Sequence, residues 1–274
     1  MSISNPPKAL LFDVLGTVLD WQTSLTRGIH AITKEKLAST SAVALSPEVR
    51  HSASSLDDKK WEDFVLQWHQ SYIDFTHGYQ PKKDEWVNFT THNLRSLKRL
   101  LAEWKLDGLF TEDELNEVTR LWNYLDPYRD SSKGIALLNQ KFITSTLSNS
   151  DVSTLTDQAA HANLPWKTMT SSEHFAAYKP YPAVYHGAAA KLGVKPEECA
   201  LVAAHLGDLQ GAKACGYQAI YVERESQEKF KPEDVKKAKE EGWVDMWVSL
   251  GEEGFLTVAD RFGIVRKSVD PDKP

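Results

Sequence analysis

The distribution of short apolar runs constrains the fold of this chain more than any other feature of its sequence. Five runs lack the polar alternation of half-exposed strands: residues 9–12, 142–147, 200–204, 219–222 and 246–250. Runs of this kind are typical of strands buried on both faces. Helical patterns lie between most of them, and strands that alternate with helices predict an α/β fold built on a parallel, doubly wound sheet.

The interval between the first and second runs has no convincing strand, and its apolar residues recur at helical spacing. One such set is Trp61, Phe64, Val65, Trp68, Tyr72 and Phe75. Thr111 and Glu114 carry the signature of a capping box. We therefore expect residues 21–125 to form an inserted helical domain, with residues 1–20 and 126–274 as the core. Within the insert, Ser39 to Asp58 is expected to be a loose connection.

Composition excludes several classes of protein. The 274 residues carry a net charge of −6, which disfavours nucleic acid as a partner. Cys199 and Cys215 are too few for a disulfide framework or a zinc cluster and are expected to be buried. No apolar stretch is long enough to span a membrane and no leader is evident, so we expect no membrane partner and a cytoplasmic location. The mixed-charge run from Glu228 to Glu241 predicts a solvated helix face.

Polar residues that follow the first three predicted core strands define a candidate site. In an open parallel sheet, ligands bind beyond the carboxyl ends of the strands. That rule selects Asp13, Gly16, Thr17, Ser148, Asn149, Ser150, His205, Gly207 and Asp208. Lys179 joins this set because it lies just before a predicted helix.

Such a set can perform covalent catalysis. Asp13 would be the nucleophile, Lys179 would hold it ionised, and Asp208 would position or deprotonate water. Thr17, Ser148 and Asn149 would supply hydrogen-bond donors for a negatively charged substrate.

Each of these residues also has a purely structural interpretation. Asp13 could cap a turn, Asp208 could be a helix N-cap, and Lys179 could be an ordinary surface lysine. Ser148, Asn149 and Asp151 could simply begin the next helix.

Four ordered segments resemble the motifs of the haloacid dehalogenase (HAD) superfamily. They are Phe12-Asp13-Val14-Leu15-Gly16-Thr17, Leu147-Ser148-Asn149, Tyr178-Lys179-Pro180 and Val202-Ala203-Ala204-His205-Leu206-Gly207-Asp208. Tyr185, six positions beyond Lys179, and Trp86-Val87-Asn88-Phe89 are similar to segments of the type II (S)-2-haloacid dehalogenases. The resemblance covers nearly the whole chain and implies a Rossmann-like core whose helical insert is a cap.

The resemblance also implies a metal-independent hydrolase without a cofactor. Its substrate would be a small 2-haloacid, whose halogen-bearing carbon is attacked by Asp13. Halide leaves, and water hydrolyses the resulting aspartyl ester. The residue matching Asp208 supports that water, and a homodimer is possible, although no segment identifies an interface. The substrate-binding residues would be Leu15, His69, Gln70, Phe89, Ser148, Asn149 and Tyr185.

Leu15 separates this chemistry from that of the superfamily's phosphatases. Phosphatases carry a second aspartate at this position, which protonates the leaving oxygen. Halide is a weak base and leaves without a proton, so an apolar residue fits carbon–halogen cleavage better. The predicted site also has few carboxylates that could bind Mg²⁺, and a hard cation requires several oxygen ligands. We therefore expect no required metal.

Four positions depart from the dehalogenase pattern. His69 replaces the arginine expected to meet the halide, and His205 replaces an asparagine near the catalytic water. Ala203 replaces a serine, and Leu15 an aromatic residue. His69 would be a cation only below its pKa, ordinarily about 6.5, and could equally be a packing residue. His205 could hold water as an amide does, or act as a base.

Two rival functions follow from these residues. A phosphatase of the same fold would use Asp13 on a phosphate ester. A weakly active or non-catalytic protein that binds small anions would retain the pocket without turnover. Tyr185 and the cap aromatics, including Phe89, could serve the core or the wall of an apolar pocket.

Overall fold

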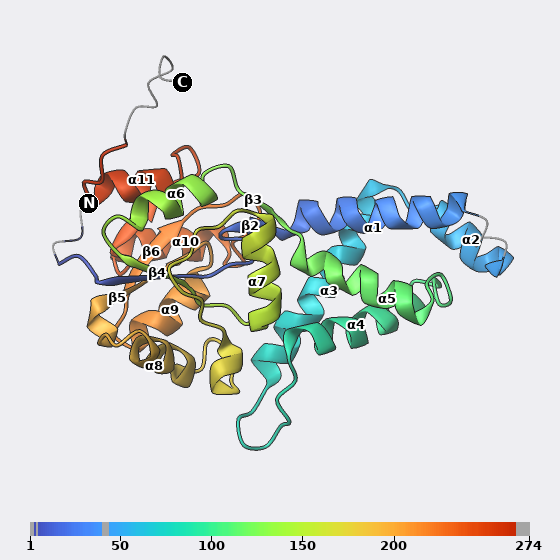
Figure 1. Ribbon diagram of the computed structural model, residues 1–274, viewed down its shortest axis with the longest axis horizontal. Coiled ribbons are helices and arrows are strands. Elements are labelled where there is room, and N and C mark those ends of the chain that lie inside the picture. Colours follow the sequence, from blue (N-terminus) through green and yellow to red (C-terminus); the bar gives the residue numbers. More distant parts are fainter. Residues whose placement is uncertain (1–2, 4, 40–43, 267–274) are drawn as a thin grey trace, which may run out of the picture.

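A five-stranded parallel sheet forms the centre of the protein (Figure 1). The computed structural model describes residues 3, 5–39 and 44–266. In sheet order, the strands are β4 (Ile143–Thr146), β1 (Ala9–Phe12), β5 (Cys199–Ala203), β6 (Gln218–Val222) and β7 (Met246–Val248). All neighbouring pairs are parallel. The structure confirms the α/β class, and each expected apolar run contains or overlaps one strand.

Helices cover both faces of this sheet, which is why its strands carry apolar residues on both sides. The core helices are α6 (Ser131–Leu138), α7 (Val152–His161), α8 (Pro182–Lys191), α9 (Leu206–Ala214), α10 (Pro232–Glu241) and α11 (Phe255–Arg261). Phe12 packs on one face against Phe255 of α11, with ring centroids 5.2 Å apart. Leu11, its neighbour on β1, packs on the other face in a cluster with Val184 of α8 and Leu209 of α9.

The segment after the first strand forms a separate group of helices, on the right in Figure 1. Its helices are α1 (Trp21–Ala38), α2 (Pro47–Ser54), α3 (Asp58–Gly78), α4 (Phe89–Glu103) and α5 (Glu112–Thr119), followed by the 3-10 helix η2 (Arg120–Asn123). The antiparallel pair β2 (Leu19–Asp20) and β3 (Asp126–Pro127) joins the two connections to the core. This geometry supports our proposal that residues 21–125 form the cap.

Local details refine several expectations. The Thr111 capping box of α5 is present. The expected loose connection contains α2, which begins at Pro47 and is capped by the Ser46 side chain; residues 40–43 of that connection lie outside the described part. The helix expected near Asp208 begins at Leu206. Within the described residues, no helix has the length and apolarity needed to cross a bilayer.

Candidate active site

A cavity of about 350 Å³ lies where the carboxyl ends of the core strands meet α3 of the insert. Pockets for small ligands ordinarily measure about 300–1,000 Å³. Its lining includes the following residues that the sequence singled out: Asp13, Leu15, His69, Gln70, Ser148, Asn149, Ser150, Lys179, His205, Gly207 and Asp208. The parallel sheet therefore brings together residues that are as much as 195 positions apart, from 13 to 208.

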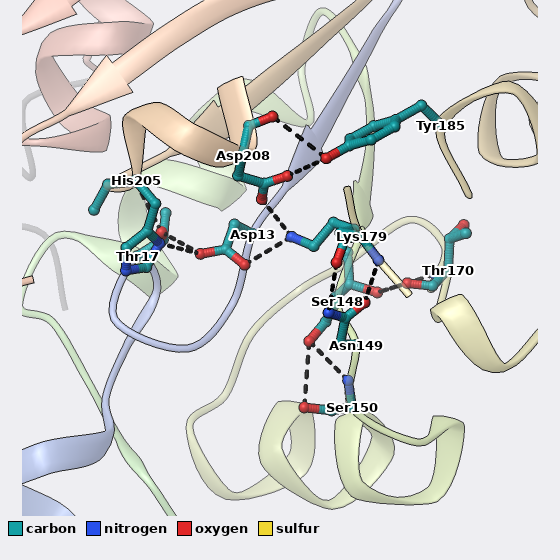
Figure 2. A network of polar contacts seen from close by, with 12 residues as sticks. Asp13, Thr17, Ser148, Asn149, Ser150, Thr170, Lys179, Tyr185, His205 and Asp208 are labelled. Atoms are coloured by element: carbon teal, nitrogen blue, oxygen red, sulfur yellow. Dashed lines mark hydrogen bonds and ion pairs between the residues drawn. The ribbon is translucent and has the colours of Figure 1, made fainter. Parts of the chain in front are cut away.

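A buried lysine joins two carboxylates beside this cavity (Figure 2). The Lys179 Nζ lies 2.8 Å from Asp13 Oδ1 and 2.5 Å from Asp208 Oδ2. Tyr185 donates to Asp208 Oδ1 over 2.6 Å. Lys179 is only 8% exposed, so the interpretation of Lys179 as a surface lysine is wrong.

The second oxygen of Asp13 receives two further contacts. Thr17 Oγ1 donates to Oδ2 over 2.7 Å, and His205 Nδ1 lies 2.9 Å from the same atom. Thr17 is itself fixed, because the backbone N–H of Ala204 donates to its Oγ1 over 2.9 Å. Asp13 thus has Lys179 on one oxygen, and Thr17 with His205 on the other.

These contacts decide the charge of Asp13. Burial alone would raise the pKa of the Asp13 carboxyl, but the charge of Lys179 and the hydrogen bond with His205 outweigh burial and hold that pKa well below its usual range. Burial would likewise lower the pKa of Lys179, yet the charges of Asp13 and Asp208 raise it. The nucleophile candidate is therefore an anion beside a cation at neutral pH.

Asn149, in the loop after β4, fixes the backbone of the lysine. Asn149 accepts a hydrogen bond from the Lys179 backbone N–H over 2.8 Å, and its amide donates to the Lys179 carbonyl over 3.4 Å. Ser148 Oγ accepts from the Ser150 N–H over 3.1 Å. The Asn149 side chain therefore holds the Lys179 backbone in place through two hydrogen bonds. A contact of the Asn149 side chain with substrate remains a prediction.

The cap contributes an uncharged histidine to the cavity. His69 stacks on Trp21, with ring centroids 4.0 Å apart and planes 26° from parallel. Burial first, and then the charges of His205 and Lys229, lower the pKa of His69 to about 3. His69 therefore both packs and lines the cavity, and it meets a ligand there as a neutral ring.

The other predicted cap residues differ in their access to the cavity. Gln70 lines it and donates to Asp74 Oδ1 over 2.8 Å. Phe89 is buried in an aromatic cluster and does not line the cavity. Its ring centroid lies 4.8 Å from that of Tyr72 and 5.3 Å from that of Trp122. In this structure Phe89 can influence a ligand only through its neighbours.

The two structural interpretations of acidic residues at helix starts have different outcomes. The N-cap of α9 is His205, whereas Asp208 lies in its first turn and bonds to Lys179 and Tyr185. Asp151 begins α7 as its N-cap residue, as the structural interpretation expected, but its side chain makes no capping hydrogen bond there. Its carboxylate instead accepts from the backbone N–H groups of Phe89 and Thr90, over 2.8 and 2.9 Å, at the start of α4.

The sequence interpretation missed the loop after β6. Glu228, Lys229 and Phe230 line the cavity, although the charged run beginning at Glu228 was expected to be a solvated helix face. The helix α10 begins only at Pro232. Glu228 Oε2 accepts from the Leu206 N–H over 2.8 Å, which ties this loop to the start of α9. The strand-end rule could have found these residues, because they follow a fourth parallel strand.

Comparison with known proteins agrees with the class that the sheet, insert and acid–lysine site define. A model of the haloacid dehalogenase-like hydrolase family matches residues 7–216. The chain belongs to this family of hydrolases.

Individual relatives place the chain among dehalogenase folds. It is 24% identical over 227 residues to the (S)-2-haloacid dehalogenase 4A of Burkholderia cepacia, covering 80% of this chain and 84% of that one. It is 23% identical over 168 residues to the haloacetate dehalogenase H-2 of Moraxella sp. (strain B), covering 60% and 74%. The crystal structure of the L-2-haloacid dehalogenase PA0810 is 27% identical, with a TM-score of 0.74 over 93% of this chain and 99% of that chain.

Proposed function

We propose that this protein hydrolyses short 2-haloacids to 2-hydroxyacids through an ester on Asp13. The observation that carries the proposal is the ionised Asp13 carboxylate at the cavity, with Lys179 2.8 Å from Oδ1 and Leu15 two positions further on. The named dehalogenase relatives support the substrate class.

The first step is displacement at carbon. One Asp13 oxygen forms a bond to the halogen-bearing carbon as the carbon–halogen bond breaks, and halide leaves with the electron pair. Asp13 is already deprotonated, so no base is needed for this step. Halide requires no acid either, which fits the side chain of Leu15 at the cavity wall.

The second step releases the product. Water attacks the carboxyl carbon of the ester, and Asp208, held by Lys179 and Tyr185, is placed to position that water and accept its proton. The bond between the ester oxygen and the carboxyl carbon then breaks, the leaving oxygen takes the proton from Asp208, and the second proton of water passes to solvent. The product hydroxyl consequently keeps an oxygen from Asp13, while the restored carboxylate gains one from water.

Halide release from 2-chloropropionate and haloacetates, measured in EDTA, tests this function. We expect release by the wild-type protein and at least a ~1,000-fold loss in Asp13→Asn, whose amide is a poor nucleophile. Full activity in Asp13→Asn, or no release by the wild-type protein from any of these acids, contradicts the proposal.

Two further measurements address the mechanism and its rivals. A single turnover in ¹⁸O water should label the Asp13 carboxylate, whereas label in the product alone indicates direct attack by water. A phosphatase would instead turn over an aryl phosphate with Mg²⁺, and a binding protein would take up the anion stoichiometrically without halide release.

A further inference from the structure

Lys229 brings to the cavity an ammonium group that takes no part in the two chemical steps. It lies on the loop between β6 and α10, and it lines the cavity. Its charge also helps to lower the pKa of His69, which the insert contributes to the cavity wall. The Lys229 ammonium therefore acts on the cavity, although the residue as a whole is exposed.

Hydrogen bonds beside Lys229 fix the backbone that carries it. Gln227, two positions earlier, is buried and accepts from the Trp21 indole N–H over 2.9 Å, at the start of the insert. Glu228 Oε2 accepts from the Leu206 N–H over 2.8 Å, at the start of α9. The other oxygen of Glu228 accepts from the N–H groups of the next two residues, over 2.7 and 2.8 Å. The loop is thus tied to both the insert and the core, and its lysine stands where the two meet.

The carboxylates that line the cavity have other partners. Asp13 and Asp208 contact the Lys179 ammonium, over 2.8 and 2.5 Å. Glu228 directs its two oxygens to three backbone N–H groups. Within the described part of the chain, the Lys229 ammonium has neither a hydrogen bond nor an ion pair. It is therefore available to an anion that enters the cavity.

The side chains expected to receive a negatively charged substrate already have protein partners. Thr17 donates to Asp13 over 2.7 Å. Asn149 donates to a backbone carbonyl over 3.4 Å, and Ser148 donates to the Ser150 hydroxyl over 3.2 Å. These contacts leave the three side chains with less capacity for substrate than an unpartnered ammonium has. Hydrogen bonds to charged groups are also stronger than those between neutral groups.

We propose that Lys229 binds the carboxylate of the substrate and thereby selects 2-haloacids over uncharged organic halides of similar size. This assignment rests on the proposed function, because it concerns the substrate of that reaction. The carboxylate carries its charge before the reaction begins, whereas the halogen becomes an anion only when its bond to carbon breaks. An ammonium that is available before the reaction therefore acts on substrate binding and lowers KM more than it raises kcat.

Isothermal titration calorimetry with propionate, propionamide and bromide tests the assignment without depending on catalysis. Propionate carries the carboxylate alone, bromide represents the halide, and propionamide is an uncharged analogue of propionate. In Lys229→Gln we expect propionate to bind ~10-fold more weakly than in the wild type, because a charged partner is lost at a partly solvated position. Bromide should lose less affinity than propionate, and propionamide should lose none.

Lys229→Arg and Lys236→Gln complete the experiment. Arginine keeps the charge and should retain most of the affinity for propionate. Lys236 is exposed on α10, so Lys236→Gln controls for the loss of one surface charge and should leave that affinity unchanged. In steady-state kinetics with 2-chloropropionate, Lys229→Gln should raise KM while kcat stays within ~2-fold of the wild type.

Three results would overturn the proposal. The wild-type protein could fail to bind propionate, Lys229→Gln could bind propionate as tightly as the wild type, or this variant could lose affinity for bromide at least as strongly as for propionate. Weaker propionate binding by Lys229→Gln, combined with no halide release by the wild-type protein, would instead retain the carboxylate assignment and reject the proposed function.

Discussion

Replacing Lys179 with methionine tests the electrostatic core of the site. Met keeps most of the apolar length of the side chain but leaves Asp13 and Asp208 without the ammonium at 2.8 and 2.5 Å. Removing one partner of a buried ion pair ordinarily costs about 3–5 kcal/mol, because a charge stays buried without compensation. We expect a loss of that size in the free energy of unfolding at pH 8, measured by urea denaturation through tryptophan fluorescence.

The pH dependence of this loss is the sharper result. In the wild-type protein the folded pKa of Asp13 lies below its unfolded value of 3.8, so the stability it contributes is complete at pH 5–8 and is lost only as pH falls further. Without Lys179, burial raises the pKa of Asp13 relative to the wild type, although the hydrogen bond with His205 still opposes that rise. The folded variant then takes up its proton at a higher pH than the folded wild type, so its deficit in stability narrows as pH falls from 8 to 5.

A matched control separates this effect from the general loss of a lysine. Lys191 is exposed at the end of α8, and Lys191→Met should lie within about 0.5 kcal/mol of the wild type at both pH values. The reasoning is refuted if Lys179→Met costs less than about 1 kcal/mol at pH 8, or if its deficit is the same at pH 5 and pH 8.

Three other predictions concern neighbouring contacts. His69→Ala should slow halide departure more than ester hydrolysis in single-turnover kinetics, because a neutral ring at the cavity wall can still donate to halide; an unchanged first step assigns His69 to packing. Tyr185→Phe removes the 2.6 Å hydrogen bond to Asp208 and should lower kcat by ~10-fold, the equivalent of about 1.5 kcal/mol, with little change in KM; an equal rise in KM contradicts a role in positioning Asp208. Asp151→Ala leaves two backbone N–H groups at the start of α4 without their acceptor and should reduce stability by about 1–3 kcal/mol in thermal or urea unfolding. Asp107→Ala, at an exposed position of the insert, is the control, and equal losses in the two variants contradict a specific role for Asp151.

The sheet could be predicted from the sequence because its strands are buried on both faces. The first run, 9–12, coincides with β1, and the run at 219–222 misses only the first residue of β6. Helix boundaries were less accessible. The helix α2 escaped prediction because its eight residues have only one buried side chain, Ala53, although Ser46 and Pro47 form a recognisable helix start.

In the site too, some residues could be predicted from sequence patterns, whereas others depend on how the elements pack together. Asp13 and Asp208 could be selected because strand ends converge at one edge of a parallel sheet, and Lys179 because it precedes a predicted helix. Their partners could not all be selected. The attachment of Asp151 to α4 depends on how the insert lies against the core, and composition alone made the loop at Glu228 resemble solvent-exposed chain. Sequence patterns identify groups that one element presents, whereas contacts between elements require the packed structure.

His69 and His205 differ in the charge that their surroundings favour. Where the dehalogenase pattern has a cap arginine, this chain has a neutral histidine stacked on Trp21. In the core, burial opposes a charge on His205, but its 2.9 Å hydrogen bond with Asp13 raises its pKa. A charge on His69 would be buried, and burying an unpaired charge is costly. His205 Nδ1 already lies beside Asp13 before substrate arrives, so this contact of the nucleophile is made within the core and does not depend on the insert.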